Sequence, residues 1–514
     1  MPGGRFVDRL RGVRRRRTVS NPRLRALGIP VLAIVLAGAA CSTATPDDAG
    51  PSTGPAPTST TELRQDESDE DETDDQDSLP EGWLKAEEVL AVVSELDGQL
   101  AIGNGPTVAV ARPDGLAHLE LDGGQTNLAS QPTWSTDGSR LIWSSDSAQA
   151  HEARVQAFTE DGEVDGPWLV SNVPGQPIFY FQWSSDDSTI AYLRNSVRPS
   201  LVEAGVVGPG QAARWVADDA PFFFSWAPDS GVFAGHVGDE RLAIFDPGEA
   251  LEFGLDQESS EESLRSRPSE DPVAGDDLAT GGGFSSPAWL DSKTVLAVVD
   301  GQLSRVNATD GLVSSLLKVN GPIRFVLSPD RTKVALQLAP GSASDDVLEA
   351  ALPSGGQRSV QTDVGDQELI VLDIETGRTT AVTDQNVVLA WEWSPDSSKL
   401  AWLETGGSVP NRRARWRFWS GDQPVGGDVS SPIIQLSIKE LVNYLPFFAQ
   451  YTHSISRWSP DSSAFALAGS IGGRAGIWIH LVDQVGEPVL VASGDFVSWG
   501  SGPTPSPTAG RSPA

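Results

Sequence analysis

The residues of this chain that could perform acid–base or metal chemistry are few and scattered. It has five histidines: His118, His151, His236, His453 and His480. None of them stands at a metal-ligand spacing from another histidine or from a carboxylate. The chain also lacks the G-x-S-x-G turn of a serine hydrolase and a glycine-rich phosphate loop ahead of a helix. We therefore predict no catalytic residue, no cofactor and no metal site.

One stretch combines cations with aromatic rings in an otherwise acidic chain. Residues 412–419 read Arg-Arg-Ala-Arg-Trp-Arg-Phe-Trp. Arginine stacks on aromatic rings and binds phosphate or carboxylate groups through two parallel hydrogen bonds. The candidate binding residues are Arg412, Arg413, Arg415, Trp416, Arg417 and Trp419. The alternative, which we favour slightly, is an edge strand whose arginines pair with the domain's own acids.

The N-terminal forty residues have the features of a secretion signal. Nine arginines between Arg5 and Arg25 precede an apolar run from Ala26 to Ala40, and Cys41 follows as the only cysteine. Such a run is shorter than the roughly 20 residues that a membrane span needs. Residues 1–40 resemble a bacterial lipoprotein signal, which implies a lipid anchor on Cys41. An ordinary signal peptide with a chance cysteine is the alternative, and the export route is open between the general and twin-arginine pathways.

The composition excludes some partners and predicts a tether. A net charge of −33 repels nucleic acid, so we expect no nucleic-acid partner. With a single cysteine, the chain can form no internal disulfide. Residues 41–80 are rich in Pro, Ser and Thr, and nine of the twelve residues from Asp66 to Asp77 are acidic. We predict a disordered, extended linker there, because the segment has too little apolar content to fold.

The scaffold that would position any site is a repeated turn, seen best at Trp393-Ser394-Pro395-Asp396-Ser397. Serine, proline and a following glycine or serine occupy the positions that a type I turn favours. An aromatic residue closes the strand before the turn, and an apolar strand follows it. Each copy therefore predicts a hairpin corner with a tryptophan to bury. The structural repeat residues are Trp134, Asp137, Trp183, Asp186, Trp226, Asp229, Trp289, Asp291, Asp330, Trp393, Asp396, Trp458, Asp461 and Trp499.

These copies, over roughly residues 98–500, resemble the TolB-type, WD40-like (PD40) propeller repeat. The resemblance implies an all-β fold: a single β-propeller of about eight four-stranded blades, with seven as the alternative. Residues 496–500 read as one further corner, so we expect the C-terminal strand to complete the first blade and close the ring. The propeller is predicted at 81–500, and its insertions at 249–283, 339–367 and 406–456. Residues 501–514 form a tail that we predict to be disordered.

Two classes of function fit these observations. TolB-like propellers act as envelope interaction modules, so the resemblance implies a lipoprotein on the outer face of the cell membrane that binds a protein or an envelope polymer. The alternative is an envelope hydrolase or lyase that acts on glycan. A pair of carboxylates facing one pocket, with raised pKa values, would favour the enzyme. A rim without such a pair favours the binding scaffold, and on the sequence we lean against an enzyme.

Overall fold

The computed structural model of this chain describes residues 84–502, apart from short gaps and two longer ones at 253–275 and 339–368. The chain divides into two units, 1–75 and 76–514, and all described residues belong to the second. The predicted signal peptide, Cys41, the tether and nearly all of the C-terminal tail therefore lie outside the described residues. None of the helices in the described part has the length and apolar content needed to cross a membrane.

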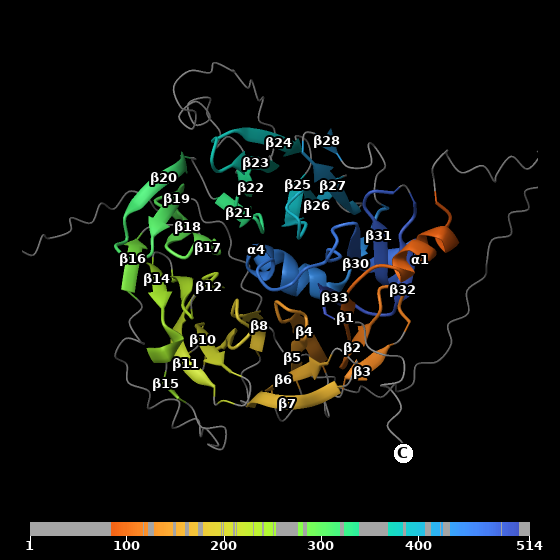
Figure 1. The fold of residues 1–514 in the computed structure, drawn as a ribbon, viewed down its shortest axis with the longest axis horizontal. Helices are drawn as coiled ribbons and strands as arrows, with labels where there is room; N and C mark the ends of the chain where they lie inside the picture. Colours follow the sequence, from red (N-terminus) through yellow and green to blue (C-terminus); the bar gives the residue numbers. More distant parts are fainter. Residues whose placement is uncertain are drawn as a thin grey trace, which may run out of the picture. The chain divides into compact units, whose positions relative to one another are not determined.

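The described strands form eight antiparallel sheets, which we call blades I to VIII (Figure 1). The strands of each blade are named here from the innermost outward. Blade I is β33 (Phe496–Gly500), β1 (Gln99–Asn104), β2 (Thr107–Ala111) and β3 (Leu119–Leu121), and blade II is β4 (Leu128–Trp134), β5 (Arg140–Asp146), β6 (His151–Phe158) and β7 (Val164–Asn172). Blade III is β8 (Ile178–Trp183), β9 (Ile190–Asn195), β10 (Val202–Val207), β11 (Arg214–Asp219) and the short β15 (Leu251–Glu252), and blade IV is β12 (Phe222–Trp226), β13 (Phe233–Val237), β14 (Arg241–Phe245) and β16 (Asp276–Thr280).

Blades V to VIII follow the same order. Blade V is β17 (Ala288–Asp291), β18 (Thr294–Val299), β19 (Gln302–Asn307) and β20 (Val313–Lys318), and blade VI is β21 (Ile323–Leu327), β22 (Lys333–Leu338), β23 (Leu369–Asp373) and β24 (Thr379–Thr383). Blade VII is β25 (Val387–Trp393), β26 (Lys399–Gly406), β27 (Arg413–Ser420) and β28 (Gln423–Pro424), and blade VIII is β29 (Gln435–Leu436), β30 (Ala464–Ile471), β31 (Arg474–Leu481) and β32 (Val489–Ala492).

The last strand closes the ring. β33 pairs antiparallel with β1, from Gln99 opposite Gly500 to Gly103 opposite Phe496. The C-terminal strand is thus the innermost strand of a blade whose other strands come from the beginning of the domain. This domain is an eight-bladed β-propeller. The predicted fold class and the predicted closure by the C-terminal strand are both confirmed, with eight blades instead of the alternative seven.

Six corner tryptophans each join a blade to the one before it. Neighbouring inner strands do not pair with each other, so carbonyl groups along them need donors from elsewhere. Indole N–H groups supply these donors at six junctions, across 2.9 to 3.4 Å: Trp134 to Ser498, Trp183 to Thr133, Trp226 to Gln182, Trp289 to Ser225, Trp393 to Val326 and Trp458 to Glu392. This explains why the repeat uses tryptophan, which buries a large ring and still offers a donor.

The corner aspartates hold the turns. In five copies one carboxylate oxygen accepts from the serine hydroxyl two residues earlier at 2.6–2.7 Å and from the backbone N–H two residues later at 2.8–3.1 Å: Asp137, Asp186, Asp330, Asp396 and Asp461. The hydroxyl and backbone donors around Asp186 lower the pKa of its carboxyl. Burial raises the pKa of Asp461, but the bonds from Ser459 and Ser463 outweigh it, so that this pKa also falls.

In three copies the residue after the aspartate links the corner to the preceding one: Asp187, Ser397 and Ser462. Asp187 has a φ of 55°, and its carboxylate accepts from the backbone N–H groups of Thr136 and Asp137 in blade II. In the blade II copy the same position is Gly138, with a φ of 70°. A Cβ there would collide with the backbone of Gly502, which lies against this corner. The glycine is therefore required where Gly502 packs over the turn.

Two parts of the structure differ from the sequence prediction. Helix α1 (Ala86–Ser94) precedes blade I and buries Val89 and Val93 in the core cluster shared by blades I and VIII. The second difference lies in the insertion predicted at 406–456, because β27 and β28 within it are regular strands of blade VII. β27 pairs with β26 over its whole length, so only the residues after this blade are additional.

Candidate functional site

The inner strand of blade VIII is interrupted. β29 pairs Leu436 with Gly469 of β30, and in that register Glu440 would face Phe465. Instead, Trp458 forms the bridge to Phe465. The chain therefore contains 18 residues more here than an uninterrupted strand would need. We call residues 437–457, which make this excursion, the channel plug. They occupy the centre of the ring, where α4 lies in Figure 1.

The channel plug is a chain of short helical turns. They are η2 (Glu440–Tyr444), η3 (Leu445–Phe447) and α4 (Phe448–Tyr451). Residues 437–440 read Ser-Ile-Lys-Glu, the sequence pattern of a helix capping box, and this box is half present. The Ser437 hydroxyl accepts from the backbone N–H of Glu440 at 3.1 Å and donates to the carbonyl of Asp495. The Glu440 side chain does not complete the box, because it pairs with Arg457.

Gln450 docks the plug on the inner strand of blade IV. Its amide nitrogen donates to the carbonyl of Phe224 at 2.7 Å, and its amide oxygen accepts from the N–H of the same residue at 2.9 Å. The hydroxyl of Ser286, at the entrance to blade V, donates to that oxygen as well. The buried side-chain amide of Gln450 thus pairs with both the N–H and the carbonyl of Phe224, as a neighbouring strand would.

Aromatic residues of the plug contact the other blades. The Tyr451 hydroxyl donates to the carbonyl of Phe179 in blade III and accepts from the amide of Gln131 in blade II, each at 2.6 Å. Phe448 lies edge-on to Trp391 of blade VII and beneath the guanidinium of Arg324 in blade VI. The plug is therefore fitted to the inner strands of the surrounding blades, and its buried rings fill the channel at this level.

A buried charge cluster fixes the end of the plug. Arg457 pairs with Glu440 at 2.6 Å and lies 3.7 Å from the carboxylate of Glu392, and its guanidinium covers the ring of Tyr444. The backbone N–H of Arg457 donates to the other oxygen of Glu392. Burial raises the pKa of Glu392 to about 7 and also raises that of Glu440, although Arg457 acts against both shifts. Two carboxylates thus share one cation inside the ring.

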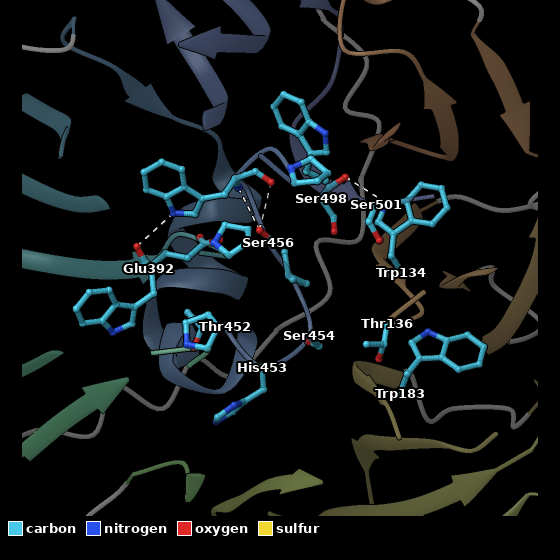
Figure 2. Close-up of a pocket in the computed structure, with 18 of the residues that line it drawn as sticks. Trp134, Thr136, Trp183, Glu392, Thr452, His453, Ser454, Ser456, Ser498 and Ser501 are labelled. Carbon is cyan, nitrogen blue, oxygen red and sulfur yellow. Dashed lines mark hydrogen bonds between the residues drawn. The ribbon is translucent and has the colours of Figure 1, made fainter. Parts of the chain in front are cut away.

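A cavity of about 460 Å³ opens beyond the plug, on the side where the blades make their corners (Figure 2). Its floor is the end of the plug, residues 452–456. Figure 2 shows Trp134, Thr136 and Trp183 on one side of it and Glu392 on the other, with Ser454 between them. Prolines of three corners complete the rim: Pro329, Pro395 and Pro460.

The polar groups of the cavity are neutral or already paired. Ser498 is 1% exposed, and its hydroxyl has no hydrogen-bond partner among the described residues. Burial lowers the pKa of His453 to about 4, so its imidazole is neutral at pH 7. Glu392 lines the cavity, but one of its oxygens accepts from the Arg457 backbone and the other is near its guanidinium. In the described part of the chain, no three His, Cys, Asp or Glu residues are grouped as a metal site would require.

These carboxylates do not meet the condition that we set for an enzyme. Glu392 and Glu440 form a pair with raised pKa values, yet only Glu392 lines the cavity. Glu440 points to Arg457 within the core and is 2% exposed. The pair therefore neutralises a buried cation and does not face a shared pocket.

The predicted arginine–aromatic stretch lies apart from the cavity. Arg412 is outside the described residues, and only the backbone of Arg413 is described. Trp416 and Trp419 are buried in the blade core. Arg415 is half-buried, and Arg417 pairs with Glu404 at 2.6 Å, as the alternative of internal pairing expects. A binding role for the arginines stays a prediction.

Sequence reasoning did not identify the residues of the cavity floor or Glu392. A signal for Glu392 was present, because a charged residue between Trp391 and Trp393 interrupts a strand that is otherwise apolar. The floor could have been suspected from the extra length between Leu436 and Trp458. Its position inside the ring could not, because it depends on contacts with blades that are distant in the sequence.

The matches of this chain to known proteins are distant. No family model and no curated protein matches the chain. Among solved structures, it is similar to TolB from Acinetobacter baumannii at 14% identity, covering 63% of this chain and 61% of that chain, with a TM-score of 0.32. It is also similar to the C-terminal WD40 domain of Sif2 (14%, 66% and 92%, TM-score 0.33) and to the β-propeller domain of the Trilobed protease from Pyrococcus furiosus (9%, 71% and 85%, TM-score 0.34).

Proposed function

We propose that this chain is a membrane-tethered envelope propeller that binds its partner at the corner-side cavity. The observation that carries the proposal is the cavity itself, walled by the repeated corners and floored by the chain's own plug. Rigid walls with a few converging polar groups are typical of binding sites. The partner is a protein or an envelope polymer. The alternative of a glycan-acting hydrolase or lyase lacks support from the carboxylate pair, as argued above.

Site-specific cross-linking in the cell tests this proposal. A photoreactive amino acid replaces Thr136, which is exposed at the cavity rim, and in a control it replaces Glu375, which is exposed on the β23–β24 turn of blade VI. We expect discrete adducts from position 136 and none from position 375. Identical adducts from both positions, or none from position 136, would show that the cavity is not the binding site.

The tether gives a prediction about location. Because Cys41 is unique and follows a short apolar run, Cys41→Ala should release the protein from the membrane fraction or leave an uncleaved precursor. Fractionation and the mass of the mature N-terminus measure this, with Ser42→Ala as the matched control. If Cys41→Ala fractionates and is processed like the wild type, the proposed lipid anchor is wrong.

A further inference from the structure

We propose that the propeller has a second interaction surface, on the side of the ring away from the corners, which binds a polypeptide segment carrying an apolar side chain and a carboxylate. This inference goes beyond the proposed function, which concerns the corner side. Three observations lead to it: an exposed apolar face of the channel plug, a small apolar cavity beside that face, and a neighbouring arginine that has no acidic partner among the described residues.

The first turns of the channel plug present apolar side chains to solvent. In the described part of the chain nine large hydrophobic residues are exposed, and five of them fall between residues 433 and 447. The plug enters the ring after Leu436, which pairs with Gly469 near the end of β30 that is far from the corner, so these turns lie on the side opposite the corners. We call the exposed and partly exposed apolar residues of these turns the plug patch: Ile438, Leu441, Val442, Leu445 and Phe447.

The plug patch is one face of the helical turns. Its first four members stand at positions i, i+3, i+4 and i+7, the spacing of side chains that share a helix face. Glu440 and Tyr444 lie on the other face and are buried in the ring. An amphipathic helix normally turns its apolar face to the core, whereas here the apolar face is outside. A contiguous apolar surface of this kind marks an interaction site.

A small cavity beside Phe447 is suited to one apolar side chain. It lies between the plug and blades III and IV and has a volume of about 90 Å³, against about 300–1,000 Å³ for a small-molecule site. Its partly exposed walls include Phe179, Val202 and Phe223. The polar groups at its border are already paired within the protein: the amide of Gln450 and the hydroxyls of Tyr180 and Tyr451. The cavity therefore offers a ligand only carbon surfaces.

Arg324 of blade VI is a cation without an acidic partner among the described residues. Its guanidinium donates to the carbonyl of Leu389 at 3.1 Å and to the amide oxygen of Gln337 at 3.5 Å, and both acceptors are neutral. Burial lowers the pKa of Arg324 to about 10, and no acid acts against this shift, so the side chain is charged at pH 7. This is unusual in a chain whose 70 acidic residues outnumber its 37 basic ones. Arg324 is partly exposed, so that a ligand can reach it.

Arg324 lies at the level of the plug patch. Arg324 in β21 and Phe223 in β12 occupy equivalent positions, each three residues before the end of its inner strand. Phe223 contacts the ring of Phe447, with 6.5 Å between the ring centroids. The guanidinium of Arg324 lies 4.3 Å from the ring centroid of Phe448, the next residue of the plug. A segment that crosses the plug patch can therefore use both the small cavity and the cation.

Charge and shape favour a polypeptide segment over other occupants. Covering Arg324 without a counter-charge would cost free energy, so its ligand should bring a carboxylate. A second copy in a symmetric contact would bring the same patch, which contains no acidic residue. A bilayer surface is bound through clustered Lys and Arg, whereas the one lysine of these turns, Lys439, pairs with Asp495. The net charge of −33 in addition repels anionic lipid.

Selection from a phage-displayed library of random dodecapeptides tests the inference. The target is the purified full chain, and the selected peptides are synthesised and titrated by fluorescence anisotropy. We expect a consensus that combines a large apolar residue with Asp or Glu, and a Kd below about 100 μM. Phe447→Ser should weaken binding by more than about tenfold. The matched control is Leu312→Ser, at an exposed residue of the β19–β20 turn in blade V, which should bind like the wild type.

A double-mutant cycle assigns the carboxylate to Arg324. Replacing the acid of the peptide by its amide should weaken binding about tenfold on the wild type and leave binding to Arg324→Gln unchanged. Arg378→Gln, at an exposed residue of the β23–β24 turn in the same blade, is the matched control and should keep the tenfold difference. Melting temperatures show whether the variants are folded. If Arg324→Gln is not, Arg324→Met, which keeps an apolar contact with Phe448, takes its place in the cycle.

Other results would overturn the inference. It is wrong if no peptide with both groups is selected, or if Phe447→Ser or the Arg324 variant binds the peptide like the wild type. A wild-type dimer in light scattering that Phe447→Ser dissociates would assign the patch to a second copy. Binding of the Cys41→Ala chain to phosphatidylcholine vesicles, abolished by Phe447→Ser, would assign it to a membrane, and peptide binding only after deletion of residues 341–366 would assign it to the chain's own insertion. None of these results bears on the cross-link from position 136, so the proposed function is tested separately.

Discussion

Truncation of the chain before Asp495 will unfold the whole domain and not only blade I. The deletion removes β33, in which every residue is buried. It takes away the inner strand against which β1 pairs and the Ser498 carbonyl that receives the Trp134 indole. Losing a buried Phe or Trp side chain costs about 3–5 kcal/mol each, and β33 contains one of each beside Val497. Their sum approaches the net stability of a domain, which is about 5–15 kcal/mol.

Denaturant unfolding monitored by tryptophan fluorescence and circular dichroism measures this effect. The matched control is truncation after Gly502, which keeps β33 and the contact of Gly502 with Gly138. We expect the control to unfold cooperatively with an unchanged midpoint, and the shorter chain to show no cooperative transition. A truncated chain that loses one blade but keeps the original midpoint would mean that the blades are an open array.

The fold was predictable because each blade repeats a local signal. The turn chemistry of Ser394, Pro395 and Asp396 depends on neighbours along the chain, so the sequence alone shows it. The hydrogen bonds from the indole groups to the preceding blade could not be predicted, because the acceptor for Trp393 is the carbonyl of Val326, 67 residues away. Local patterns thus predicted the blades, whereas the contacts that join them appeared only in the structure.

In the arginine–aromatic stretch, residues 412–419, the spacing of the side chains indicates their environment better than the residue types do. Arg415 and Arg417 alternate with Trp416 and Phe418, and this period of two is that of a half-buried strand. In β27 the two aromatic side chains are indeed buried and the arginines are half-buried. The composition made this stretch a binding candidate, but the alternation of arginine and aromatic residues fits the alternative that we favoured slightly, a strand paired within the domain.

The channel plug was the hardest part to predict. Its sequence mixes Leu441 and Phe447, which are about half exposed, with Tyr444 and Phe448, which are buried. No helical period separates them, because the segment changes from π to 3₁₀ to α geometry within twelve residues, 440–451. Which side chains are buried depends on where the inner strands of other blades lie. A sequence can show that such residues are additional, but not that they return into the ring.

Replacing Arg457 by methionine will destabilise the propeller strongly at neutral pH. The cation is 1% exposed and is shared by Glu392 and Glu440, which are both buried. Breaking a buried ion pair by removing one partner costs about 3–5 kcal/mol, because a charge is left without compensation. We expect a loss of that size in the free energy of unfolding at pH 7.5, measured by denaturant titration.

The loss should depend on pH in a defined direction. In the wild type, the pKa of Glu392 is raised from 4.5 to about 7, so the folded protein holds a proton that the unfolded chain has released. This group therefore makes the protein less stable as pH rises from about 4.5 to 7. The corner aspartates, whose pKa values are lowered, act in the opposite sense and only at more acidic pH. The change in the free energy of unfolding between pH 4.5 and 7 therefore reports on the cluster of Arg457, Glu392 and Glu440.

Without Arg457, both carboxylates are protonated in the folded state over a wider pH range, so the penalty of Arg457→Met should grow with pH and nearly vanish near pH 4.5. The triple variant Arg457→Met, Glu392→Gln, Glu440→Gln removes every charge of the cluster and should recover most of the stability at pH 7.5, because a neutral replacement of a buried ion set is often tolerated. A penalty that is equal at pH 4.5 and 7.5, and that the triple variant does not relieve, would mean that Arg457 holds the plug by packing on Tyr444 and Trp416 and not by its charge.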